Sequence, residues 1–429
     1  MKLCFTGDAI ALSHPKKEYW ENNVLLEEIR ECEIRGTNLE MVLSGGESFA
    51  STFCGGYWMT ADADRLEILE KFHFNHYAMA NNHTMDYSYK GLECTSRLLD
   101  SKNLLHSGAG KDLDSASRAE YLHCEDGVVA FITCTASCDD AARAGRASKT
   151  IPARPGVNML RHSERIFVTS EQLKVIDEIA EQTCINARFL KAVRMGIHSL
   201  PKEIHRLGRI EFVEGEKTQK RTSCHKGDLS RIINEIRKAQ KKTSNIIVSI
   251  HSHDIKGMTD DTPDEYVEEF ARACIDAGAT AIIGTGTHQL KAIEVYKGKP
   301  IFYSLGNFMF VSEHMDYAPS DYYERYGEDL QTDLDDIWLK RSKNNTVGLE
   351  FDAANYLSIV PILTIEENKL IKVELLPIEL GFVGGDRQKG FPYVADCRQR
   401  EQIFSRIKEL SKEYGTVIEN SNDKMVIKL

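Results

Sequence analysis

The feature that most constrains the fold is the alternation of short apolar runs with segments of helical periodicity. Seven runs have the length and residue types of buried strands, and helical patterns fit between them. This alternation is typical of an α/β protein. The expected strands are KLCFTGD, HYAMAN, VVAFITCTAS, NIIVSIHSHD, ATAIIGTGTH, AIEVYKG and PIFYSLGNF.

Side chains suited to metal binding follow several of these runs. In open α/β sheets, sites form beyond the carboxyl ends of the strands. Carboxylates, amides and imidazoles together make an oxygen–nitrogen shell suited to Zn, Mn or Fe, and cysteine is missing from these positions, so a structural cysteine-type zinc site is not expected. Each residue alone is compatible with a turn or a helix cap. Their joint occurrence predicts a metal site whose ligands come from among Asp8, Glu40, Asn81, Asn82, His83, His251, His253, Asp254 and His288.

Composition excludes some classes of partner. The chain has 54 Lys and Arg against 65 Asp and Glu, a net charge of −11, which argues against nucleic-acid binding and peripheral membrane binding. Thr6, Gly7 and Asp8 interrupt the first apolar run, and no later run approaches about 18 residues, so neither a signal peptide nor a membrane anchor is expected. The 11 cysteines are scattered, without a C-x-x-C pair. Reduced thiols and a cytoplasmic location are the simplest interpretation.

Two stretches do not follow the alternation of strand-like and helical segments. We expect one main domain over 1–390, with a helical and loop insertion at 139–228 that includes a long helical pattern over Ser170–Met195. An acidic, tyrosine-rich loop at 312–345 either closes over the site or binds a partner. Residues 391–429 are expected to form a helix and a strand that pack on the core.

Several short motifs occur in the order found in a known family. The segments GD, NLE, ANNH followed by Asp86, GAG, RPGVNMLR and IEVYKGKPIFYSLGNFMF resemble the CapA family, named for poly-γ-glutamate capsule synthesis, within the calcineurin-like metallophosphatase superfamily. The match covers about 2–139 and 245–310. The resemblance implies two packed β-sheets flanked by helices, the four-layer sandwich of metallophosphoesterases.

The resemblance also implies roles for individual residues. It places Asp8 on one metal ion, Glu40 as a carboxylate bridging two ions, and Asn82 on the second ion. His83 would act on the substrate or leaving group, and Asp86 would either orient His83 or cap the helix that follows it. Later strands would supply the remaining imidazole ligands, His251 and His288.

This chain departs from the family pattern at three ligand positions. Ile10, Thr285 and Gly286 stand where imidazoles are usual, and HSH replaces H-W-G, so His253 is expected as a replacement ligand. One ion or an altered pair is therefore as compatible with the sequence as a full two-metal centre. For recognition of an anionic small-molecule or peptide-like substrate the sequence offers Arg154, Asn158 and Arg161, with a solvated basic loop as the alternative.

The leading hypothesis is a metal-dependent hydrolase. The metal would activate a water molecule and polarise a phosphoryl or acyl oxygen, with His83 as proton donor. Its substrate would be a phosphoester or a peptide or γ-glutamyl amide. Two alternatives remain at this point: a metal-assisted peptide epimerase, and a non-catalytic component of polyglutamate synthesis.

Overall fold

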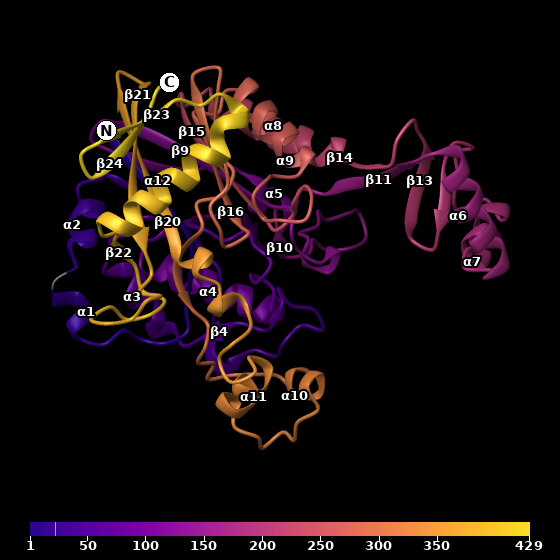
Figure 1. Ribbon diagram of the computed structural model, residues 1–429, viewed down its shortest axis with the longest axis horizontal. Coiled ribbons are helices and arrows are strands. Elements are labelled where there is room, and N and C mark those ends of the chain that lie inside the picture. The colour runs from indigo at the N-terminus through magenta and orange to yellow at the C-terminus, as the bar shows by residue number, and fades with distance from the viewer. Residues whose placement is uncertain (22) are drawn as a thin grey trace.

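A ten-stranded sheet forms one half of the core of this computed structural model, which describes residues 1–21 and 23–429 (Figure 1). Its order is β23-β24-β21-β20-β1-β2-β5-β6, with β19 also beside β1 and β22 beside β21. The strands are β1 (Lys2–Ala11), β2 (Ile34–Leu39), β5 (His76–Ala78), β6 (Leu105–Ser107), β19 (Asn307–Val311), β20 (Leu357–Glu366), β21 (Lys369–Glu379), β22 (Tyr393–Val394), β23 (Ile418–Ser421) and β24 (Lys424–Ile427).

A six-stranded sheet, ordered β17-β18-β16-β15-β9-β8, packs against the first. Apolar side chains from both sheets fill the space between them, and the rings of Phe5 and Phe131 meet edge to face at 6.5 Å. The predicted α/β architecture of two packed sheets is therefore confirmed. The strands are β8 (Glu120–Cys124), β9 (Gly127–Thr135), β15 (Asn245–Ser252), β16 (Ala281–Gly286), β17 (Ile293–Tyr296) and β18 (Lys299–Phe302).

Helices cover the outer faces of the sandwich because each has one apolar face to bury. On the first sheet lie α2 (Val24–Arg30), α3 (Leu66–Glu70) and α4 (Ser88–Ser101). On the second lie α8 (Lys226–Ala239) and α9 (Glu265–Asp276). Near the end of the chain, α12 (Cys397–Ser411) buries Ile403, Phe404 and Ile407 in the core between the sheets.

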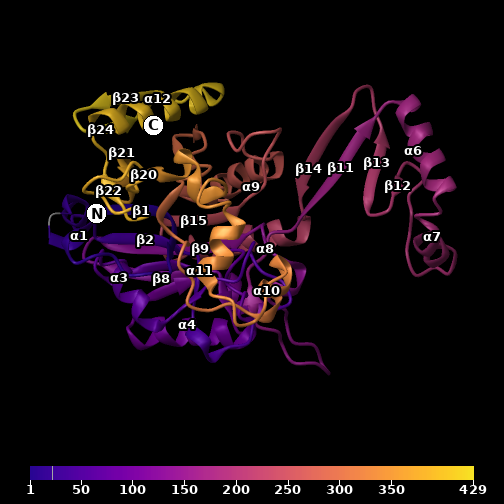
Figure 2. The ribbon, with the colours of Figure 1, turned by 60° about the horizontal axis from the view of Figure 1, so that its bottom comes forward.

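The insertion at 139–228 differs from the expected helices and loops because it contains a four-stranded sheet, ordered β12-β13-β11-β14. Two helices accompany that sheet, and together they form an arm that stands out from the body (Figures 1 and 2). The pattern over 170–195 forms two helices, since Cys184 adopts a φ of 53° and breaks it. The arm consists of β11 (His162–Val168), α6 (Ser170–Gln182), α7 (Ala187–Arg194), β12 (His205–Leu207), β13 (Ile210–Glu214) and β14 (Gln219–Cys224).

The acidic stretch at 312–345 contains two short helices where a loop was expected, α10 (Ser320–Tyr326) and α11 (Leu334–Arg341). Arg325 of α10 donates to the carbonyl oxygen of Gly56 and lies over the ring of Trp58. The stretch thus packs on the segment 51–59. The remaining short elements are α1 (Glu18–Glu21), α5 (Leu113–Ser117), and the paired strands β3 (Val42–Leu43) with β4 (Thr60–Ala61) and β7 (Ala109–Gly110) with β10 (Gly156–Val157).

Within residues 1–21 and 23–429, no helix has both the length and the apolar character that crossing a bilayer requires.

Candidate metal centre

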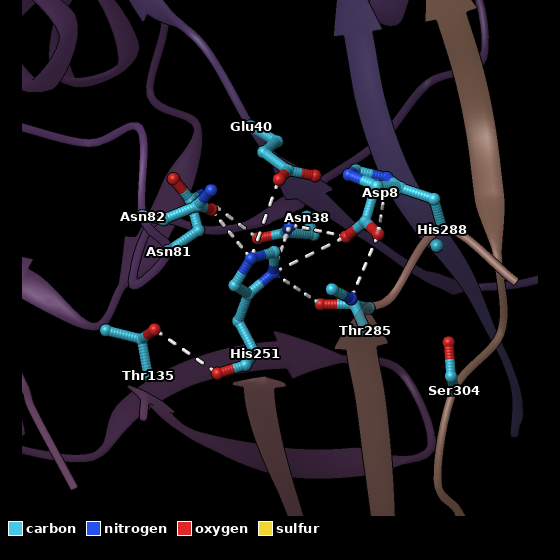
Figure 3. Close-up of polar contacts among 12 residues, drawn as sticks. Asp8, Asn38, Glu40, Asn81, Asn82, Thr135, His251, Thr285, His288 and Ser304 are labelled. Carbon is cyan, nitrogen blue, oxygen red and sulfur yellow. Dashed lines mark hydrogen bonds and ion pairs between the residues drawn. The ribbon is translucent and has the colours of Figure 1, made fainter. Parts of the chain in front are cut away.

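The carboxyl ends of parallel strands from both sheets meet at one edge of the sandwich. β1, β2 and β5 run parallel in the first sheet, and β9, β15 and β16 run parallel in the second. Their ends therefore carry polar side chains to a common place, where the carboxylates of Asp8 and Glu40 point toward the ring of His251 (Figure 3). The structure brings together all six predicted ligands, namely Asp8, Glu40, Asn82, His251, His253 and His288.

Glu40 is the most unusual residue of this cluster. Its side chain is fully buried, and neither carboxylate oxygen has a hydrogen-bond partner among the described residues. The nearest imidazole nitrogen, Nε2 of His251, lies 3.5 Å from Oε1. Burial raises the pKa of Glu40 well above its usual value, and the nearby charge of Asp8 adds to the effect. A buried carboxylate without a donor is costly, so a bound cation is the partner that this position fits.

Two sets of ligand atoms share Glu40. One set is Asp8, Glu40 and His251, and the other is Glu40, His253 and His288; within each set the ligand atoms lie within 4.8 Å of one another. Burial and the neighbouring imidazoles lower the pKa of His253 well below its usual value. A neutral imidazole is the form that binds a metal ion, so the donor set suits a divalent cation such as Zn, Mn or Fe.

Asp8 is held in its orientation by two donors. The side-chain amide of Asn38 donates to Oδ1 over 2.8 Å, and the backbone N–H of Gly286 donates to Oδ2 over 3.0 Å. Burial tends to raise the pKa of Asp8, but the adjacent rings of His251 and His288 outweigh it and hold that pKa below its usual range. Asp8 is therefore an ionised carboxylate with a fixed direction.

His83 forms a dyad with Asp86. Nδ1 of His83 lies 2.7 Å from Oδ2 of Asp86, and Asp86 also accepts backbone hydrogen bonds from Gly55 (3.0 Å) and Met59 (2.9 Å). Since the carboxylate accepts from Nδ1, Nε2 is left for other contacts. The chain at Gly55 passes close over this ring, because a Cβ there would lie 2.7 Å from Nε2.

The amide of Asn82 joins the dyad to the ligands. Its Nδ2 donates to the carbonyl oxygen of Gly55 over 2.8 Å, and its Oδ1 lies 2.8 Å from Nε2 of His251. The oxygen therefore faces the cluster, as the prediction that Asn82 is a ligand requires.

A protein-family model described as "Bacterial capsule synthesis protein PGA_cap" matches residues 2–312. The chain belongs to this family. A Sinorhizobium fredii protein, "Uncharacterized protein y4sH", is 30% identical over 404 residues, which are 92% of this chain and 85% of that protein. "PGA biosynthesis protein CapA" of Bacillus subtilis is 47% identical over 70 residues, 16% of this chain and 18% of that protein. A solved structure of a novel phosphatase from Mycoplasma pneumoniae covers 95% of this chain and 99% of its own, with 12% identity and a TM-score of 0.39.

In this PGA_cap chain, backbone geometry explains why Gly286 stands where a histidine was expected. Gly286 has a φ of 118°, and a Cβ there would lie 2.6 Å from the carbonyl oxygen of Ser252. Any side chain is therefore excluded at that position, and its N–H binds Asp8 instead. Thr285 places its hydroxyl 3.0 Å from Nδ1 of His251. Ile10 is buried in the apolar core and does not reach the cluster.

The three residues expected to recognise an anion make contacts outside the cluster. Nε of Arg154 donates to the carbonyl oxygen of Arg143 over 2.9 Å. Asn158 is fully buried and donates to the carbonyl oxygen of Thr133. Arg161 binds the carboxylate of Asp228 over 2.7 Å. Each of these side chains therefore bonds to another part of the chain.

Two residues of the site escaped the sequence reasoning. Asn38 holds Asp8, and the sequence contained a signal for it: it lies two positions before Glu40, so the two side chains leave the same face near the strand end. The Oδ1 atom of Asn307 lies 2.8 Å from Nδ1 of His288. That contact orients the imidazole and leaves its Nε2 free to bind a cation.

Proposed function

We propose that this PGA_cap protein is a divalent-metal-dependent hydrolase. The observation that carries the proposal is the buried Glu40 carboxylate, which lacks a hydrogen-bond partner and is shared by two sets of potential ligands. A structural ion pair would not account for a buried carboxylate that lacks a hydrogen-bond partner and lies among Asp8 and three imidazole rings.

The chemistry follows from the positions of the side chains. A bound divalent ion supplies a Lewis acid and a nucleophile at neutral pH. Asp8, Glu40 and the three histidines would hold such an ion, and the side-chain amide oxygen of Asn82 faces the same place. His83 carries the proton for the leaving group on Nε2, because Asp86 fixes Nδ1 and stabilises the charged ring.

The surroundings favour a reaction screened from water. Tyr57 follows Gly55 in the segment over His83, and the two rings meet at 6.4 Å. The guanidinium of Arg341, in α11, lies over the Tyr57 ring and binds Glu350 over 3.1 Å. The acidic stretch thus supports the segment that covers the proposed proton donor.

Two substrate classes fit a site of this kind, phosphoesters and γ-glutamyl or peptide amides. Both develop negative charge on oxygen in the transition state, which cationic ligands stabilise. The capsule synthesis and PGA biosynthesis named in the relatives' descriptions favour a γ-glutamyl substrate.

The test is metal content followed by turnover. Protein purified without a histidine tag is analysed for bound metal beside Asp8→Ala and Glu40→Gln, with the exposed Glu413→Gln as matched control. We expect one or two equivalents in the wild type and the control and a loss in both site variants. Metal-loaded protein is then offered phosphoesters and γ-glutamyl anilides, with His83→Ala expected to keep metal and lose turnover.

Equal metal content in all four proteins would refute the assignment of ligands. Metal binding without hydrolysis of either class would refute the hydrolase. Deuterium incorporation at a peptide Cα without cleavage would then favour the epimerase.

A further inference from the structure

The arm exposes large apolar side chains on its two helices and in the segments that follow each helix. Six of them are at least 39% exposed, whereas only three side chains form the buried apolar core of the arm. Exposed apolar surface of this kind is typical of a protein interface. The six are Val175, Ile179, Ile185, Leu190, Met195 and Ile197.

Helix α7 has no buried residue at all. An eight-residue helix is marginal in water, and most helices are stabilised by packing of an apolar face. Leu190 in α7 is 39% exposed and Met195 just after it is 64% exposed. The helix therefore offers apolar surface that another molecule can cover.

The charged residues of the two helices differ in net sign: α6 carries Glu171, Asp177, Glu178 and Glu181 against Lys174, and the charged residues of α7 are all basic. Glu178 and Glu181 lie on α6, and Arg188, Lys191 and Arg194 lie on α7. None of these five forms an ion pair with any residue among 1–21 and 23–429. The surface thus has an acidic part on α6 and a basic part on α7, with apolar residues beside both. A two-fold rotation can place α6 of one copy against α7 of another, so the surface is complementary to itself.

The root of the arm is fixed to the body, so the helices are presented in a defined direction. Lys220 of β14 binds Asp264 over 2.9 Å, and Arg221 binds Glu265 over 2.6 Å. The rings of His162 and Tyr266 stack at 4.1 Å. The arm extends away from the body in both views (Figures 1 and 2), so a second molecule can reach its helices.

We propose that the α6–α7 face of the arm is the interface of a two-fold homodimer. The acidic α6 of one copy faces the basic α7 of its partner, twice, and the six apolar side chains form the centre. The exposed side chains within residues 170–197 of each copy supply the contacts of this interface. This arrangement buries apolar surface of α7 and places the two acidic side chains of one copy beside the three basic side chains of the other.

The decisive experiment is a charge exchange between two variants, measured by sedimentation velocity on the full chain. One variant is Glu178→Lys with Glu181→Lys, which makes both helices basic. The other is Arg188→Glu with Lys191→Glu, which makes both helices acidic. Each variant alone should have a dimer Kd raised at least about tenfold, because like charges then face each other.

Mixing the two variants should restore a species of twice 48.5 kDa, since a basic copy then faces an acidic copy at both contacts. The matched control is Glu216→Lys, on the β13–β14 turn of the same arm, and it should dimerise like the wild type. Restoration on mixing also shows that both variants fold.

A wild type that stays at 48.5 kDa at every concentration would overturn the proposal. The same holds if both variants dimerise normally, or if mixing fails to restore the dimer. A monomer that instead binds vesicles of anionic lipid would assign the face to a membrane and would likewise reject the dimer.

Discussion

Replacing Glu40 with Gln should abolish most of the stabilisation that a divalent cation gives the folded protein. The substitution keeps the shape of the side chain and removes the buried charge that lacks a donor. In the wild type, a cation at 100 times its Kd adds about 2.7 kcal/mol to the free energy of unfolding. With an unfolding entropy of about 2.1 cal/mol/K per residue, 429 residues give about 0.9 kcal/mol/K, so the wild-type Tm rises by about 3 °C.

In Glu40→Gln, loss of a shared ligand should weaken binding at least about 100-fold, which leaves about 0.4 kcal/mol and a Tm shift below about 1 °C at the same metal concentration. Without metal, the variant should unfold at the same temperature as the wild type or higher, because an amide is less costly to bury than a carboxylate. Differential scanning calorimetry with and without added Mn²⁺ or Zn²⁺ measures both effects. Equal metal-induced shifts in wild type, Glu40→Gln and the Glu413→Gln control would refute the reasoning.

Three further predictions test the surroundings of the site. Gly55→Ala should displace the side chains of Asn82 and His83, because a Cβ there would lie 2.6 Å from Nδ2 of Asn82 and 2.7 Å from Nε2 of His83. It should lower kcat about 100-fold and also reduce bound metal, which steady-state kinetics and metal analysis check together. Gly286→Ala should lower the free energy of unfolding in urea by about 3 kcal/mol, because its Cβ meets backbone at 2.6 Å; Gly298→Ala, at a φ of 73° in open space, should cost only about 1 kcal/mol. Two arginines lower the pKa of Asp228 to about 2 against the effect of burial, so its stabilisation of about 2 kcal/mol is present above pH ~4 and is lost as the pH falls toward 2. Urea midpoints of Asp228→Asn and wild type should therefore differ at pH 7 and converge in acid, and a constant difference would contradict the ion pairs.

The sequence was informative about the site because its ligands stand at or near strand ends, and Asp8 lies three residues before the end of β1. Asp8, His251 and His288 each follow or end an apolar run, so the pattern located them before their distances were known. What the sequence could not supply was the contact between distant segments. Nothing local indicates that Gly55 lies over His83 or that Arg325 supports that segment, because these contacts arise from tertiary packing alone.

In the arm, by contrast, the sequence pattern was itself a weak indicator of β-strands. Strand β14 (QKRTSC) is rich in polar residues, and β12 has only three residues. A sheet that buries so little apolar surface lacks the alternation that marks a strand, so this region was expected to hold helices and loops. The break between α6 and α7 at Cys184 could not be predicted from a glycine or proline, because neither residue occurs there.

The pairing of β1 has a consequence for how this protein is made. Residues Lys2–Cys4 bond to β20 at Thr364–Ile362, which lies beyond the region 2–312 matched by the family. At ribosomal rates of about 5–20 residues per second, roughly 20–70 s pass between synthesis of the first strand and its partner. During that time an apolar edge is open to other chains, so the nascent protein should depend on chaperones, and a version shortened to the family-matched region should aggregate.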